Sequence, residues 1–187
     1  MALRALPPGG AADADGAVLK ARHPAISPAY AVLLSALVMG IIGALGLWAG
    51  QAWLFPSLGP TIFLQAVTPQ EPAARPWNTL AGHAIGVAAG FAALFLCGAQ
   101  HAPPVMSTDT LSAGRVAATA LAVGATVAIQ LAARAQHPPA AATTMLITLG
   151  GLKPDLETVL VIAIGVALVA ALGEGARLLH PDRRGPP

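Results

Sequence analysis

The sequence predicts an all-α membrane protein with four long transmembrane helices and two short, broken half-helices. Hydrophobic residues make up 56% of the 187 residues and charged residues only 10%, whereas an average soluble domain is about 25% charged. The mean hydropathy is +0.69. Four apolar stretches are long enough to cross a bilayer, and two more stop short of that length.

The composition also excludes several classes of protein. A soluble domain of this size would need more polar residues to cover its surface. Nucleic-acid binding needs dense positive charge, and the net charge is only +2. The single cysteine, Cys97, excludes an intrachain disulfide and a cysteine-based metal site. We expect no metal, no cofactor and no nucleic-acid partner, and we expect the lipid bilayer to be the main surrounding.

The chain divides into one transmembrane domain and two tails. Residues 1–28 contain prolines, glycines and scattered charges but no apolar run of the signal-peptide type, which predicts a disordered N-terminal tail. Residues 29–180 form the domain, whose two halves are about 30–99 and 111–179. Residues 181–187 resemble the N-terminal tail in composition and are predicted to be a second tail.

The predicted elements follow one another as long, short, long in each half. The short stretches of 15 and 14 residues would reach only about 21 to 22 Å across a hydrocarbon core of roughly 30 Å. Each begins among prolines, which interrupt a helix, so we expect half-helices preceded by irregular backbone. The long stretches are 30–50, 79–99, 111–134 and 156–179, and the short ones are 53–67 and 139–152.

This order indicates an internal repeat. An offset of 82 residues places Pro56 on Pro138 and Thr61 on Thr143. If the short segments cross the bilayer, eight of the ten Lys and Arg residues lie on the cytoplasmic side, and if they only dip in, seven do. The positive-inside rule therefore slightly favours short segments that cross the bilayer. Crossing implies an inverted repeat, whereas dipping in and returning implies a parallel one. Both termini are expected to be cytoplasmic, at the inner (plasma) membrane.

Two long stretches carry small residues at four-residue spacing. Such faces let helix backbones approach closely in lipid, so we expect helix contacts there. Four long helices make a thin wall around a pathway, so we also expect a homo-oligomer that uses such faces. The small residues are Gly82, Gly86 and Gly90 in the second long stretch, and Ala163, Ala167, Ala171 and Gly175 in the last.

Polar residues near the two breaks are the candidates for a binding site. His137, Pro138 and Pro139 interrupt apolar sequence, and the backbone groups freed there need a protein or water-filled surrounding. Free N–H groups and the positive end of the helix dipole favour an anion at the start of each half-helix. Two opposed half-helix N-termini can hold one anion near the bilayer midplane. The remaining candidates at these ends are Ser57, Gly59, Thr61, Thr143 and Thr144.

Three charged residues lie near the ends of the long stretches. Arg115, Glu174 and Arg177 can extend towards the membrane interface, so we expect structural roles for them. Glu174 and Arg177 are three residues apart, a spacing that permits a local ion pair.

Three motifs in this order resemble the HPP family of small integral membrane proteins. They are PSLGPT at 56–61, PWNTLAGH at 76–83 and QHPPAAAT at 136–143, within a resemblance that covers about residues 28–175. The resemblance implies four transmembrane helices and, from plant plastid and cyanobacterial members, nitrite transport; most bacterial members have no assigned substrate. Glycines often follow the two prolines in the family, whereas this chain has Ala140 and Ala141, a departure that bears on how closely the backbone approaches a ligand.

The resemblance makes His137, Pro138, Pro139, Asn78, Gly82 and His83 the motif positions. Asn78 suits the N-cap of the second long helix. His83 lies near the glycine face of that helix and is expected to point into the protein. If His83 and His137 approach the same cavity, either ring can donate to an anion or carry a coupled proton.

These observations favour a transporter or channel for a small monovalent inorganic anion, with nitrite as the leading substrate, and not an enzyme. Two alternatives stay open: an intramembrane enzyme that uses His83 and His137 with Glu174, and a membrane scaffold or sensor subunit. The sequence has no G-x-S-x-G elbow and no H-E-x-x-H motif, and only eight acidic residues, which weighs against an enzyme. A scaffold would leave the helix breaks without a purpose.

Overall fold

The structure is a computed structural model that describes residues 27–179. The predicted tails fall almost entirely on residues 1–26 and 180–187, which lie outside that range. Within it the chain forms helices, turns and irregular segments without a strand, which confirms the all-α prediction. Four helices are long and apolar enough to span a membrane: α2 (Pro28–Ala49), α4 (Pro76–Leu96), α6 (Ala113–Ala132) and α8 (Leu156–Leu179).

The two short apolar stretches form broken half-helices, as predicted. They are α3 (Leu58–Val67) and α7 (Ala140–Thr148), of 10 and 9 residues. Non-helical chain runs from residue 50 to 57 before α3 and from 133 to 139 before α7. The prolines in these segments prevent α2–α3 and α6–α7 from forming continuous helices. The connections hold three single turns: η1 (Pro72–Ala74), η2 (Ala99–His101) and α5 (Val105–Thr108).

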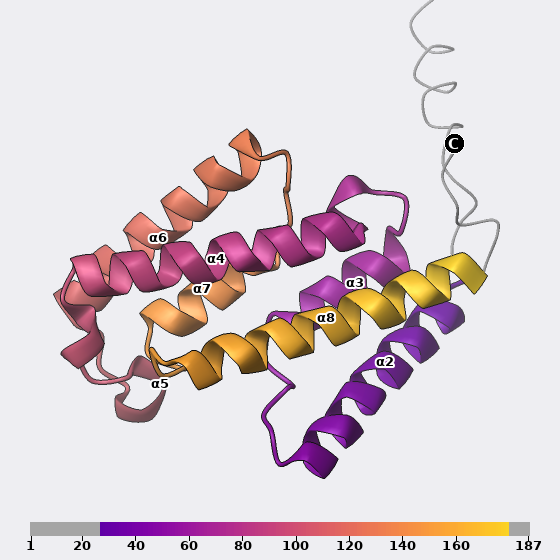
Figure 1. The fold of residues 1–187 in the computed structure, drawn as a ribbon, viewed down its shortest axis with the longest axis horizontal. Coiled ribbons are helices and arrows are strands. Elements are labelled where there is room, and N and C mark those ends of the chain that lie inside the picture. The colour runs from indigo at the N-terminus through magenta and orange to yellow at the C-terminus, as the bar shows by residue number, and fades with distance from the viewer. Residues whose placement is uncertain (1–26, 180–187) are drawn as a thin grey trace, which may run out of the picture.

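The two halves run in opposite directions. In Figure 1, α2 and α4 run from right to left with α3 reversed between them, whereas α6 and α8 run from left to right with α7 reversed. Helices α3 and α7 begin at residues 58 and 140, which reproduces the predicted offset of 82. This arrangement is that of an inverted repeat, with three helices of alternating direction in each half.

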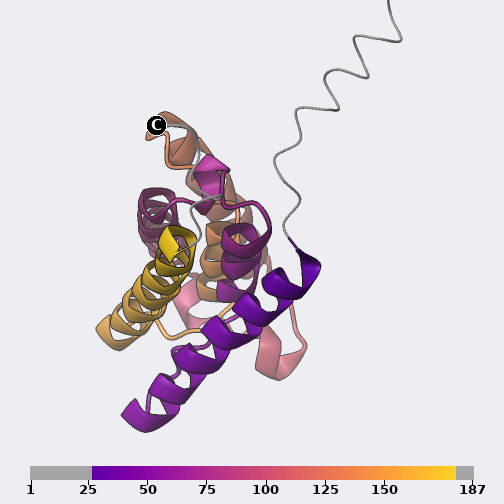
Figure 2. The same ribbon diagram turned by 90° about the vertical axis from the view of Figure 1, so that its right-hand side faces the viewer.

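The last helix of each half packs against helices of the other half. Helix α4 packs mainly against α6 and α7, while α8 packs against α2 and α3, and α4 and α8 meet each other along the centre. Figure 2 shows α2 lying obliquely on the outside of the bundle. Only Val38, Ile42 and Gly46 of α2 are buried. The core therefore lies around α3, α4, α7 and α8, where the two breaks also meet.

The glycine face of α4 forms the close contact that the sequence predicts. A Cβ on Gly82 would lie 2.6 Å from the Cβ of His137, and one on Gly86 would lie 2.8 Å from the carbonyl oxygen of Ala140. Any side chain at either position would push away the segment that contains the second break. These glycines therefore let α4 lie directly against the start of α7.

The predicted small-residue face of α8 is wrong as a contact within the chain. Ala163, Ala167 and Ala171 are exposed. Gly165 and Gly173 are buried instead, where they contact the Phe55 and Gln65 side chains. Four-residue spacing occurs on both faces of this helix, and spacing alone does not distinguish the buried one.

Cysteine labelling tests the three-pass topology. Glu71 and Lys153 are exposed and lie in connections at opposite ends of the bundle (Figure 1). In a Cys97→Ala background, Glu71→Cys and Lys153→Cys are expected to react with an impermeant maleimide from opposite sides of the membrane. Labelling of both from one side would support short helices that dip in and return.

Candidate functional site

Five polar side chains from the two breaks and α4 meet in the centre of the bundle. None is more than 2% exposed, so the group is closed off from its surroundings. Three are hydroxyls and two are imidazole rings, and no member is a carboxylate, lysine or arginine. We call this group the polar cluster; its members are Ser57, Thr61, His83, His137 and Thr143.

Hydrogen bonds join the members of the polar cluster in a row. Ser57 Oγ lies 2.7 Å from Thr143 Oγ1, which lies 2.8 Å from Nδ1 of His83. Thr61 Oγ1 stands between the two rings, 3.3 Å from Nε2 of His83 and 3.1 Å from Nε2 of His137. The ring centroids are 5.0 Å apart. One threonine hydroxyl therefore links both histidines.

A main-chain carbonyl determines the direction of this row. Nδ1 of His137 lies 2.7 Å from the carbonyl oxygen of Ala73 in η1. A carbonyl only accepts, so Nδ1 must carry the proton, and Nε2 of a neutral His137 can only accept. Thr61 can donate its one hydroxyl proton to this Nε2 or to the carbonyl of Ser57, 2.9 Å away. Thr61 then accepts from Nε2–H of His83, and Nδ1 of His83 accepts from the Thr143 hydroxyl. The Ser57 hydroxyl completes the row by donating to Thr143.

Side chains from α6 and α4 hold the second break in place. Oε1 of Gln130 accepts from the backbone N–H of His137 at 3.0 Å, and its Nε2 donates to the carbonyl of Gly82 at 3.3 Å. Nδ2 of Asn78 donates to the carbonyl of Gln136 at 3.1 Å. The predicted N-cap role of Asn78 is wrong, because α4 already begins at Pro76, after Arg75. Proline suits the first helical position, so the helix begins earlier in the chain than Asn78.

The first amides of α7 are not free, contrary to the expectation of uncapped N–H groups. Ala140, Ala141 and Ala142 donate to the carbonyls of the three residues that precede them, at 3.0 to 3.1 Å. The break thus closes as a tight turn of the 3₁₀ type, which satisfies its own donors. At the start of α3, the amide of Leu58 likewise donates to the carbonyl of Phe55, at 3.0 Å.

The other predicted site residues take different places. Thr144 points from α7 towards α6 and α4, where it bonds Thr126 Oγ1 at 3.0 Å and the carbonyl of Gly86 at 3.2 Å. Pro139 is buried as the residue before α7. Gly59 and Pro138 are exposed and do not belong to the polar cluster.

Three residues at or near the polar cluster were not among the predicted site residues. Ala73 has no sequence signal, because its main chain provides the contact. Gln130 is detectable as an amide inside a span, which the cost of burial in lipid makes suspect. Thr79 is fully buried one turn before His83, and its hydroxyl has no hydrogen-bond partner in the described part of the chain. Single threonines in an apolar helix carry no pattern that separates them from packing residues.

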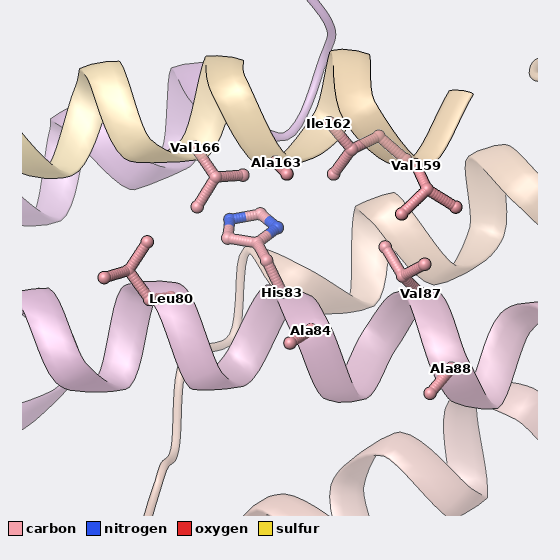
Figure 3. A pocket seen from close by; sticks show the side chains of 9 residues that line it. All are labelled: Leu80, His83, Ala84, Val87, Ala88, Val159, Ile162, Ala163 and Val166. Carbon is pink, nitrogen blue, oxygen red and sulfur yellow. The ribbon is translucent and has the colours of Figure 1, made fainter. Parts of the chain in front are cut away.

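An apolar cavity of about 380 Å³ lies between α4 and α8, beside the polar cluster. Figure 3 shows the ring of His83 extending from α4 towards α8, with Leu80, Ile162 and Val166 around it. Among the residues that line this cavity, His83 is the polar one. Its position places one edge of the polar cluster at the contact between the two halves of the repeat.

The charged residues near the helix ends have structural roles, and one is more deeply buried than expected. Arg115 is 3% exposed, and its guanidinium donates to the carbonyls of Ala102, Pro103 and Thr148 at 2.6, 3.2 and 2.8 Å. Arg177 donates to both carboxylate oxygens of Glu174, the ion pair that the spacing suggested. None of these three side chains reaches the polar cluster.

The comparisons with known proteins identify a family. Across residues 27–179, His, Cys, Asp and Glu side chains form no group of three that suits a metal ion. A search of curated proteins found no match, and neither did a search of solved structures. The family model described as "HPP, transmembrane region" matches residues 20–186, which includes both breaks, all four spans and the His-Pro-Pro run. The chain therefore belongs to the HPP family of membrane proteins.

Proposed function

We propose that this membrane protein is a transporter or channel for a small monovalent inorganic anion, with nitrite as the candidate substrate. The polar cluster is the observation that carries the proposal. It joins three hydroxyls and two imidazoles at the starts of two half-helices, inside a bundle whose other buried residues are largely apolar. Buried polar groups at membrane depth are costly and rare, which makes them candidates for a substrate pathway.

The cluster has the donors that a weakly held anion needs. Each hydroxyl supplies one O–H group and His83 one N–H group, while the N–H of a neutral His137 is engaged by Ala73. Neighbouring members of the cluster lie 2.7 to 3.3 Å apart. With no lysine or arginine in the cluster, no permanent charge would hold an anion, which would be able to leave again. Because the donors now bond one another, entry of an anion requires the starts of α3 and α7 to separate.

The repeat supplies a means of separating them. Ser57 and Thr61 belong to the first half, and His137 and Thr143 to the second, so the cluster lies across the contact between the halves. In transporters built from inverted repeats, one half rocks against the other around a central site. We place both termini on the cytoplasmic side of the inner membrane, and we propose that the exposed small residues of α8 serve a homo-oligomer.

A hydrolytic enzyme is the weaker alternative. In the described residues neither histidine has a carboxylate partner: His83 bonds Thr61 and Thr143, and His137 bonds Thr61 and Ala73. Glu174, the carboxylate that such an enzyme would need, is engaged by Arg177. A histidine that acts as a base usually requires an orienting acid.

Nitrite flux into proteoliposomes tests the proposal. His137→Ala and Thr143→Val remove two members of the cluster and are expected to lower the flux at least about tenfold, because each lost donor weakens binding by about 1 kcal/mol or more and also unpairs its neighbours. The double change Pro138→Ala/Pro139→Ala is expected to act similarly by altering the break. Thr110→Val serves as the control, since Thr110 is exposed in a connection.

Two results would overturn the proposal. One is flux in the wild type no greater than in protein-free vesicles, and the other is flux that the His137 and Thr143 changes leave unaltered. Hydrolytic or transfer activity in detergent, without flux, would instead favour the enzyme.

A further inference from the structure

We infer that a proton is the second substrate of this site, taken up by the polar cluster together with the anion, and that the Thr61 hydroxyl switches between the two proton states. The inference rests on the proposed anion transport. It follows from the way in which the hydrogen bonds of the cluster can be rearranged without loss.

In the neutral state every ring nitrogen has a partner. His137 donates from Nδ1 to the Ala73 carbonyl and accepts at Nε2 from Thr61, 3.1 Å away. His83 donates from Nε2 to Thr61 and accepts at Nδ1 from Thr143, 2.8 Å away. The two histidines are therefore expected to be opposite tautomers, with the proton on Nδ1 of His137 and on Nε2 of His83.

One added proton fits this arrangement without breaking a contact. When Nε2 of His137 is also protonated, the Thr61 oxygen can accept from both rings through its two lone pairs. Its own proton then turns to the carbonyl oxygen of Ser57, which lies 2.9 Å away. Rotation of a single hydroxyl thus converts a neutral cluster into a cationic one with all N–H donors still paired.

The row also provides a path for the proton. A proton delivered to Ser57 Oγ displaces the Ser57 proton to Thr143, the Thr143 proton to Nδ1 of His83, the Nε2 proton of His83 to Thr61, and the Thr61 proton to Nε2 of His137. Each transfer runs along a contact of 2.7 to 3.3 Å. Only O–H and N–H bonds change, and the net result is one imidazolium at His137. His83 ends as its Nδ1–H tautomer with Nε2 accepting from Thr61, so this product differs from the one reached by direct protonation of His137.

The surroundings leave this positive charge without a partner. The groups that face the two rings are Ser57 and Thr61 from the first break and α3, Thr143 from α7, and Ala73 from η1. None is charged. The charges that flank these elements are exposed: Glu71 and Arg75 lie on either side of η1, and Arg134 lies in the second break. Glu174 and Arg177 on α8 pair with each other.

An anion that enters the cluster would therefore supply the missing counter-charge. A buried charge without a partner is strongly unfavourable, whereas a buried pair is tolerated. Binding of the proton and of the anion must then favour each other, since coupling between two sites is reciprocal. The expected stoichiometry is one proton per anion, which makes the transport cycle electroneutral.

Proteoliposomes loaded with a pH dye test this coupling. An inward nitrite gradient is expected to acidify the lumen by one proton per anion, at a rate that does not depend on a valinomycin-clamped potential. Protein-free vesicles correct for diffusion of nitrous acid, and nitrate, the anion of a strong acid, serves as a second probe. Uptake should rise as the external pH falls.

Thr61→Val and Thr61→Ser distinguish the role of the hydroxyl from that of the rest of the side chain. Valine removes the shared acceptor, so proton-driven uptake should fall at least about tenfold. Serine keeps the hydroxyl and should retain most of the coupling. Anion flux without proton flux in the wild type would overturn this inference and leave the proposed function standing. Absence of anion flux would remove both.

Solid-state ¹⁵N NMR supplies a readout that does not depend on transport. Wild-type protein without anion should show an Nδ1–H histidine and an Nε2–H histidine, assigned with His137→Gln and His83→Gln. Addition of nitrite at mildly acidic pH should convert the His137 signals to the doubly protonated form. An Nε2–H tautomer at His137, or signals that the anion leaves unchanged, would contradict the inference.

Discussion

Gly82→Ala is expected to abolish most of the transport activity while the protein still inserts into the membrane. The new Cβ would lie 2.6 Å from the Cβ of His137 and 3.3 Å from Nε2 of Gln130. His137 has little room to yield, because Gln130 holds its backbone N–H and Ala73 holds its ring. Overpacking of this kind costs about 1 to 3 kcal/mol. The strain is relieved by moving the second break, which separates His137 from Thr61.

Gly124→Ala is the matched control for this change. Gly124 is exposed on α6, and a Cβ there would meet no atom within 4 Å. Gly124→Ala therefore raises the helix propensity as much as Gly82→Ala does but introduces no clash. The measurements are nitrite flux and the ¹⁵N signals of His137 in both variants. Normal flux together with unchanged His137 signals in Gly82→Ala would show that the glycine contact does not position the ring.

Arg115→Met is expected to cause a large loss of stability. It leaves the carbonyls of Ala102, Pro103 and Thr148 without their donor, and the Thr148 carbonyl is buried. An unpaired buried acceptor costs about 1 to 3 kcal/mol, so the expected loss is of that order. Because Thr148 ends α7, the change also removes a positive charge from the C-terminus of that half-helix, where the dipole favours one.

Thermal unfolding in detergent measures this loss. Arg134→Met is the control, because Arg134 lies at the other end of α6 with an exposed side chain. Arg115→Lys should recover part of the stability, since an ammonium group cannot reach three separate carbonyls as a planar guanidinium does. A melting temperature of Arg115→Met equal to that of Arg134→Met would mean that the guanidinium contributes nothing to stability.

The spans and the breaks were predictable because their causes are local. A run of about twenty apolar residues needs a helix to satisfy its backbone in lipid. Prolines at 56, 60, 138 and 139 prevent that helix from continuing, whatever surrounds it. The offset of 82 between the halves appears in the sequence for the same reason, since each half places its prolines before a short helix.

The polar cluster was predictable in its members but not in its connections. Ser57, Thr61, His83, His137 and Thr143 were all candidates, because polar groups inside a span are rare and costly. Which of these side chains touch depends on the packing of α4 and α8 against helices of the opposite half. The spacing of apolar residues in the sequence does not predict that packing. The pairing of the α7 amides was missed for a similar reason: a tight turn and a free helix end share one sequence pattern.

The dependence of His137 on Ala73 has a consequence for comparing this protein with its relatives. The proton of the imidazole is positioned by a peptide oxygen, and every amino acid provides one. Relatives can therefore differ at position 73 without altering the tautomer, and an aligned column of side chains would not reveal the contact. The position of this carbonyl depends on the length of the loop between α3 and α4. Inserting or deleting one residue there should therefore do more harm than any replacement.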